Sequence, residues 1–203
     1  MKQQVVFITW ATPKENYDSY YAYLDKKIKY NPYESPFLNW NKTLGEYLWD
    51  DFEYLRSPSC TEKYADYEAW KILFEKMFPY LRDDVIIATT SLGSCFIIKY
   101  LYENTLPVKI KRLLCVAAAI HHTEHERLGS FQLDHDKIPN IVSQISEEDI
   151  YFYHSTDDMC VDFSDFKKLQ EYFPNATFRE FDDRGHFFLE ERLPEIEQDI
   201  KKA

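Results

Sequence analysis

The sequence lacks any hydrophobic run long enough to cross a membrane, and its first residues lack the apolar segment and cleavage site of a secretory signal. It also lacks a basic stripe, because 35 acidic side chains outnumber 24 basic ones and the formal net charge is -11. Nucleic-acid phosphates and anionic membrane surfaces bind basic patches, so this charge argues against both as partners. We therefore expect a soluble, cytoplasmic protein.

Cysteine is scarce, and Cys60, Cys95, Cys115 and Cys160 show no C-x-x-C spacing. Cys95 and Cys115 lie inside apolar runs, where cysteines are more often buried thiols than disulfide partners or metal ligands. We expect Cys160 to be partly exposed, with no obvious base beside it. The cysteines therefore predict neither a disulfide framework nor a metal centre.

Internal repeats, low-complexity tracts and interdomain linkers are also missing. The chain has 203 residues, of which 45% are hydrophobic and 17% aromatic, so it can bury one core and is not disordered. We expect a single domain over residues 1-203.

Apolar runs of strand length alternate with segments of helical periodicity. The expected strands cover residues 5-9, 52-55, 85-89, 110-117, 149-153 and 177-181. The expected helices cover residues 39-47, 62-78, 92-103, 163-172 and 190-201. This alternation predicts an α/β fold, a three-layer sandwich with a mostly parallel twisted sheet, helices on both faces, and sites at the carboxyl ends of the strands.

Three short polar segments follow apolar runs, at 90-93, 154-158 and 183-186. They bring a serine, an aspartate and a histidine in the chain order of the nucleophile, acid and base of α/β-hydrolases. At the first segment, a strand ends and a helix begins at Ser91. Such a corner exposes the serine Oγ and points the N–H of Leu92 at a developing oxyanion. The alternative is that Ser91 only caps the helix.

The other two segments offer Asp157, Asp158 and His186. An orienting aspartate accepts a hydrogen bond from one imidazole nitrogen, which leaves the other nitrogen to take the serine proton. Taken singly, a loop aspartate is usually a turn residue and a loop histidine is usually solvated. Their order and their places at strand ends favour the catalytic interpretation.

The chain resembles the small serine hydrolases related to retinoblastoma-binding protein 9, within the α/β-hydrolase superfamily. The resemblance extends from about Val5 to Lys201 and so covers one whole domain. The matching stretches are Glu15-Asn16-Tyr17, Tyr67-Glu68-Ala69-Trp70-Lys71-Ile72, Ser91-Leu92-Gly93-Ser94, Lys99-Tyr100-Leu101-Tyr102-Glu103-Asn104, Tyr153-His154-Ser155-Thr156-Asp157-Asp158 and Asp183-Arg184-Gly185-His186-Phe187.

The resemblance implies that Ser91 is the nucleophile, that Asp158 rather than Asp157 is the acid, and that His186 is the base. Backbone N–H groups of Leu92 and of a residue near Trp10 or Ala11 would form the oxyanion site. No metal or organic cofactor is implied.

Three positions depart from the family pattern. Thr89 stands where the elbow has glycine, Met159 stands where the acid is followed by proline, and Thr9-Trp10 replaces a His-Gly pair. A threonine at the elbow adds side-chain atoms where the helix passes the strand, so we expect Thr89 to slow the reaction without abolishing it.

Two stretches are longer than a minimal core needs. Residues 12-38 are rich in tyrosine and either wall a substrate cleft or pack a surface helix on the sheet. Residues 118-140 are rich in histidine and acidic residues, among them His121, His122, Glu124, His125, Asp134, His135 and Asp136. This density raises a metal hypothesis, but no H-E-x-x-H signature is present, and a solvated loop near the cleft is the preferred interpretation.

The sequence therefore predicts a serine hydrolase that cleaves a small carboxylic ester, or an amide, through an acyl-enzyme. Its partner would be a small-molecule substrate, with no nucleic acid or membrane involved and no protein partner indicated. The alternative is a catalytically weak α/β-hydrolase fold that serves as a protein- or ligand-binding module.

Overall fold

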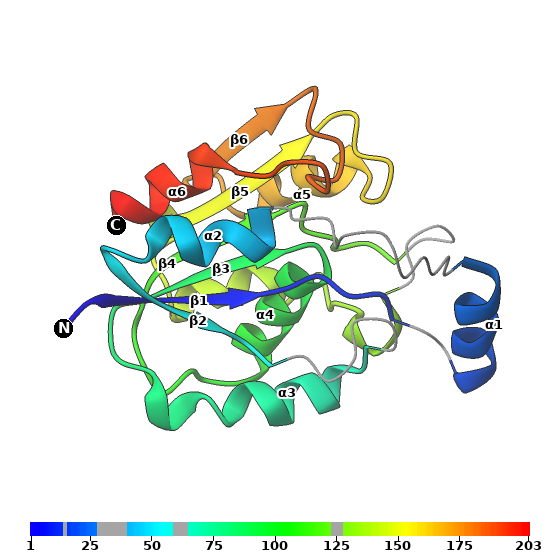
Figure 1. Cartoon of the computed structure of the whole chain (residues 1–203), viewed down its shortest axis with the longest axis horizontal. Helices are drawn as coiled ribbons and strands as arrows, with labels where there is room; N and C mark the ends of the chain where they lie inside the picture. Colours follow the sequence, from blue (N-terminus) through cyan, green and yellow to red (C-terminus); the bar gives the residue numbers. More distant parts are fainter. Residues whose placement is uncertain (14–15, 28–39, 59–64, 123–127) are drawn as a thin grey trace.

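The computed structural model describes residues 1-13, 16-27, 40-58, 65-122 and 128-203. Its centre is one six-stranded sheet in which every neighbouring pair is parallel (Figure 1). The strands are β1 (Gln3–Ile8), β2 (Phe52–Arg56), β3 (Val85–Thr90), β4 (Ile110–Val116), β5 (Ile150–Ser155) and β6 (Thr177–Phe181). Each lies where the sequence predicts a strand, so the parallel α/β sheet is confirmed.

Five of the described helices follow the predicted alternation, and a sixth, α1 (Tyr17–Lys27), lies in the tyrosine-rich stretch, where no helix range was predicted. The five are α2 (Trp40–Leu48), α3 (Tyr67–Glu75), α4 (Leu92–Glu103), α5 (Phe163–Tyr172) and α6 (Pro194–Lys201). Short 3-10 helices cover Phe78–Tyr80, Gly129–Phe131, Ile138–Ser143 and Glu147–Asp149.

Two predicted helix starts are wrong, for local reasons. Helix α3 begins at Tyr67 because the Asp66 side chain accepts the N–H of Ala69 at 3.0 Å and so caps the helix. Helix α6 begins at Pro194 rather than at 190, because proline suits the first turn, where its missing N–H has no helical acceptor.

The sheet is buried on both faces. Side chains of α3, α4 and α5 pack on one face, and those of α2 and α6 pack on the other, where the two helices lie side by side (Figure 1). Successive strand residues pack into opposite cores. Val6 and Ile8 belong to the core under α3, α4 and α5, whereas Val5 and Phe7 belong to the core under α2 and α6. Burial on both sides explains why the strands read as continuous apolar runs.

The strand order is β2-β1-β3-β4-β5-β6. The chain therefore moves outward from β1 to β2 and then crosses to β3 on the other side of β1. Such a reversal opens a crevice at the carboxyl ends of the two central strands, where open α/β sheets bind ligands. The segments after β1 and β3, which contain Trp10 and Ser91, meet at this switch point.

Helix α1 lies apart from the sheet, on the side to which the strands point (Figure 1). Tyr17 and Tyr21 are 61% and 60% exposed, and their rings stack on each other at 6.1 Å. These tyrosines therefore do not pack a helix on the sheet. Residues 28-38 of the same tyrosine-rich stretch lie outside the described residues. Among the residues described, none of the helices has the length and apolar character needed to cross a membrane.

Candidate active site

Ser91 lies on the corner between β3 and α4, with φ 52° and ψ -123°. A residue with a side chain rarely adopts a positive φ, so this backbone is strained. The corner is held from both sides, because the N–H of Ser91 donates to Val116 O at 2.8 Å and its carbonyl accepts the N–H of Ser94 at 2.9 Å. The Ser91 side chain makes no capping hydrogen bond. The capping alternative therefore does not explain this serine.

Gly93 allows α4 to lie against the end of β1. A Cβ at this position would come within 2.6 Å of both Ile8 O and Thr9 O, which is closer than side-chain carbons approach backbone oxygens. The glycine thus places the start of α4 directly beside the segment that follows β1.

Thr89 is accommodated at the elbow. Its side chain is fully buried, and its Oγ1 lies 2.7 Å from Ser94 Oγ and donates to Leu114 O at 3.1 Å. These hydrogen bonds satisfy a hydroxyl that would otherwise be costly to bury. The threonine side chain expected to crowd this position therefore fits there, and its hydroxyl links β3 to β4 and α4.

The predicted oxyanion donors lie close to the elbow. Leu92 is the first residue of α4, so its N–H has no acceptor within the helix. Trp10 and Ala11 follow β1 beside the start of α4. The Trp10 ring contacts Phe188 at a centroid distance of 5.9 Å, and Phe188 contacts the His186 ring at 4.6 Å. The segments after β1 and β6 therefore meet at this edge of the sheet.

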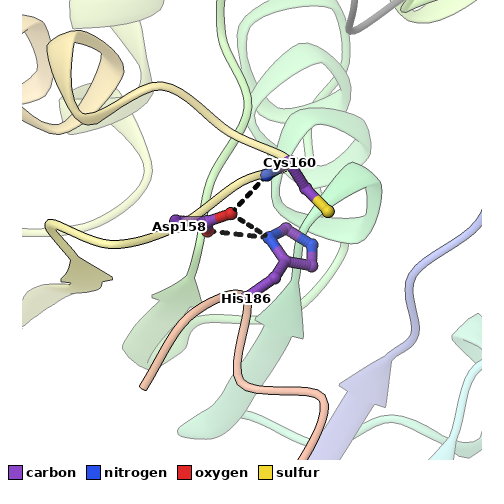
Figure 2. A group of neighbouring side chains, drawn as sticks. All are labelled: Asp158, Cys160 and His186. Carbon is purple, nitrogen blue, oxygen red and sulfur yellow. Dashed lines mark hydrogen bonds and ion pairs between the residues drawn. The ribbon is translucent and has the colours of Figure 1, made fainter. Parts of the chain in front are cut away.

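Asp158 and His186 form a hydrogen-bonded pair (Figure 2). Nδ1 of His186 lies 2.7 Å from Oδ2 and 3.0 Å from Oδ1 of Asp158, whose side chain is fully buried. Oδ1 also accepts the N–H groups of Cys160 at 2.7 Å and Val161 at 3.0 Å. A carboxylate fixed in this way holds the imidazole with Nε2 away from it, as a general base requires.

Asp157, the neighbouring carboxylate, has a different set of contacts. Its Oδ1 accepts the Ser155 hydroxyl at 2.5 Å and the Gly185 N–H at 2.8 Å, and these hydrogen bonds lower its pKa. Ser155 Oγ in turn accepts the N–H of Arg184 at 3.1 Å. Asp157 thus fastens the turn after β5 to the loop that carries His186.

The His186 loop is itself tightly turned. Gly185 and Phe187 have φ values of 50° and 56°, and the Phe187 N–H donates to Arg184 O at 2.9 Å. The Phe187 ring is buried in the core under α2 and α6, edge-on to Phe181 at 5.6 Å. This anchor fixes the residue next to the imidazole.

His154 is a second imidazole beside Asp158 that the sequence interpretation did not assign. Its Nε2 lies 3.1 Å from Val161 O and 3.8 Å from Asp158 Oδ2, and its ring packs against Phe163 and Phe166. Burial lowers the pKa of His154. Its position four residues before Asp158, at the end of a strand, was the available signal. The buried His154 ring therefore supports the turn that carries Asp158.

Ser91 is not joined to this pair in the same way. Among the described residues, no hydrogen bond links Ser91 Oγ to the His186 imidazole. The structure thus brings Asp158 and His186 into direct contact and places Ser91 at the same sheet edge. Catalytic hydrogen bonds in unliganded enzymes are often long and tighten in the substrate complex.

The cysteines divide as predicted, with one correction. Cys95 and Cys115 are buried, and burial raises the pKa of Cys115 to about 12. Cys160 is exposed, but the expectation that no base lies beside it is wrong. Its Sγ, a nitrogen of His186 and a carboxylate oxygen of Asp158 all lie within 4.8 Å of one another (Figure 2). Cys60 lies outside the described residues.

The histidine-rich stretch is less solvated than the sequence predicts. His121 Nδ1 is hydrogen-bonded to the buried Asp165, and the His121 ring stacks on His135 at 4.7 Å. His135 Nδ1 lies 2.9 Å from the Tyr172 hydroxyl. The stretch is docked on α5 because these polar contacts pair its histidines. Residues 123-127, which include Glu124 and His125, lie outside the described residues.

A cavity of about 480 Å³ opens beside the imidazole. His186, Phe188 and Leu189 line one part of it, and Met159 and Cys160 line another. A small substrate group could occupy a space of this size.

Comparisons with solved structures agree with this architecture. The ydeN gene product of B. subtilis superimposes with a TM-score of 0.74 at 19% identity, over 99% of this chain and 98% of that one. Esterase PE8 gives a TM-score of 0.62 at 11% identity, over 99% and 92% of the two chains. A protein of Xanthomonas campestris described as a hydrolase of the α/β superfamily gives 0.54 at 14% identity, over 92% and 88%.

No protein-family model matches the chain, and no curated protein matches it. Sequence identities this low show a shared fold, and the reaction has to be argued from the residues of the site. The six-stranded parallel sheet, its helices on both faces and its structural neighbours together show that this chain has the α/β-hydrolase fold.

Proposed function

We propose that the chain is a serine hydrolase that cleaves a small carboxylic ester, or an amide, through an acyl-enzyme. One observation carries the proposal: a strained serine at a strand-helix corner shares a sheet edge with a buried, hydrogen-bonded Asp158–His186 pair. Strain of this kind persists at functional sites, where the surrounding structure holds it in place. The resemblance to the small serine hydrolases related to retinoblastoma-binding protein 9 belongs to the same proposal.

In this mechanism, Ser91 Oγ attacks the substrate carbonyl while Nε2 of His186 takes its proton. The proton then passes to the leaving group. In the second half, Nε2 of His186 takes a proton from the water that attacks the acyl carbonyl and gives it to Ser91 Oγ as the bond from Oγ to the acyl group breaks. Asp158 accepts the Nδ1–H, which selects the tautomer and stabilises the imidazolium. The N–H of Leu92 and one from Trp10 or Ala11 stabilise the oxyanion.

Labelling with a fluorophosphonate tests the nucleophile. We expect a covalent adduct that maps to Ser91 and disappears in Ser91→Ala, because only an activated serine with an oxyanion site reacts in this way. Asp158→Asn should lower kcat by up to about ten-thousand-fold, since it favours the wrong histidine tautomer. Asp157→Asn is the matched control, and an equal loss in that variant would contradict the assignment of the acid.

A second candidate is a catalytically weak fold that acts as a binding module. The missing hydrogen bond between Ser91 and His186 among the described residues favours it. A folded wild-type protein that neither labels nor hydrolyses p-nitrophenyl esters would support this candidate instead.

A further inference from the structure

The Asp158–His186 pair has a third neighbour that the proposed reaction does not use. The thiol of Cys160 lies beside the imidazole, on a residue exposed to solvent (Figure 2). Among the described residues, Asp158, Cys160 and His186 form a group whose sulfur, nitrogen and oxygen donors lie within 4.8 Å of one another.

We propose that Asp158, Cys160 and His186 bind a zinc ion that reversibly blocks the active site. The binding stands on the geometry of the three side chains alone. The block on hydrolysis rests, in addition, on the proposed function.

The donor set favours zinc over harder cations. Thiolate, imidazole and carboxylate are the ligands of protein zinc sites, whereas calcium and magnesium take oxygen ligands almost exclusively. Zinc–ligand bonds of about 2.0-2.3 Å place tetrahedral donors about 3.3-3.8 Å apart. From an upper limit of 4.8 Å, the thiol must move closer by up to about 1 Å, and Oδ2 of Asp158 and Nδ1 of His186, now 2.7 Å apart, must separate by about 0.6 Å.

The carboxylate has one oxygen available for the ion. Oδ1 of Asp158 accepts the N–H groups of Cys160 and Val161, whereas Oδ2 faces His186 Nδ1 at 2.7 Å. A zinc ion shared by Oδ2 and Nδ1 takes the place of the proton between them. The backbone hydrogen bonds to Oδ1 are kept, and they hold the carboxylate in position as outer contacts do in metal sites.

The protons balance as follows. The Cys160 thiol releases its proton to solvent as the Zn–S bond forms. The His186 proton leaves Nδ1 and is carried by Nε2, so that one proton is released for each ion bound. Nε2 then bears a hydrogen and cannot accept the proton of Ser91, and the general base is lost.

The approach to the site is suited to a cation. The cavity of about 480 Å³ reaches both Cys160 and His186, and Asp157, Asp183 and Glu190 also line it. Arg184 is the basic residue of this lining, and its guanidinium is paired with Glu190 at 2.8 Å. Water from the cavity would complete a four-coordinate ion.

Cobalt(II) titration tests binding without any assay of hydrolysis. We expect a thiolate-to-cobalt charge-transfer band in the wild type that added Zn²⁺ abolishes. Cys160→Ser should lose the band and bind Zn²⁺ at least about tenfold more weakly by calorimetry, since even outer contacts to a metal site contribute that much. Cys60→Ser and His135→Gln are controls that should keep the band. A band that persists in both Cys160→Ser and Cys160→Ala would overturn the site.

Ester hydrolysis tests the block. We expect Zn²⁺ to inhibit the wild type and a chelator to restore it, and we expect Cys160→Ser to need at least about tenfold more Zn²⁺ for half-inhibition, measured against its own rate without metal. Equal inhibition of the two proteins would refute the block by this site. If no ester is hydrolysed without metal, the proposed function fails, and the cobalt band still decides the site by itself.

Discussion

Gly93 offers the sharpest test of how the fold positions the nucleophile. The change is Gly93→Ala, which puts a Cβ within 2.6 Å of the carbonyl oxygens of Ile8 and Thr9. Carbon-to-oxygen contacts between packed backbones are about 3.3 Å or longer, so α4 and the end of β1 must separate by roughly 0.7 Å. Both partners are backbone and cannot move aside as a side chain could. The start of α4 must therefore shift, and the N–H of Leu92 shifts with it.

The size of the effect follows from two opposing terms. Overpacking of this kind costs about 1-3 kcal/mol, and the gain in helix propensity from glycine to alanine returns up to about 1 kcal/mol. We expect the free energy of unfolding in urea to fall by about 1-2 kcal/mol. We also expect kcat for a p-nitrophenyl ester to fall by about ten- to a hundred-fold, because an oxyanion donor displaced by a fraction of an ångström stabilises the transition state much less.

Gly45→Ala is the matched control. It is also a helical glycine whose Cβ would be crowded, in this case by the Tyr54 ring at 2.7 Å. Gly45 lies near Met1 and Lys2, at the amino end of the sheet and away from the site. This variant should lose stability and keep kcat. If Gly93→Ala keeps full activity, or loses no more than Gly45→Ala, then the contact between α4 and β1 does not position the oxyanion site.

Two further changes test the support around the site. Thr89→Gly should lower the free energy of unfolding in urea melts by about 1-3 kcal/mol, because it removes the hydroxyl that is hydrogen-bonded to Leu114 O and Ser94 Oγ. A variant that stays stable and has a raised kcat would show instead that the threonine slows the enzyme. Burial lowers the pKa of His154 in the folded chain. Below pH about 6.5 the unfolded chain therefore binds a proton that the folded chain does not. The free energy of unfolding falls with decreasing pH until the folded-state pKa is reached. His154→Phe should flatten this dependence in melts between about pH 5 and pH 7, and an unchanged slope would assign it to other groups.

The strands and the Asp158–His186 contact could be anticipated because their causes are local. Short apolar runs with β-branched residues, such as 85-89, favour buried strands, and parallel strands bring their carboxyl ends to one edge. Polar residues after such runs must therefore gather there. The division of roles between Asp157 and Asp158 rested on a resemblance, and the structure gives the two carboxylates different hydrogen-bond partners.

Other features depended on contacts between residues far apart in the chain. No local pattern could show that Thr89 would find a partner in Leu114 O, or that His121 would pair with Asp165. The late start of helix α6 has a local cause instead, because Pro194 sets the boundary, which hydrophobic periodicity alone does not locate.

The sequence by itself determined the layered α/β architecture and the three polar segments, since hydrophobic periodicity and the order of residues act over short distances. The tertiary structure decided the further contacts that these segments make beyond the Asp158–His186 pair. It set Ser91 at a positive φ, brought α4 against β1 through Gly93, and placed the Cys160 thiol beside His186. These features arise where separate loops converge on one sheet edge, and their geometry is fixed by packing rather than by any local sequence preference.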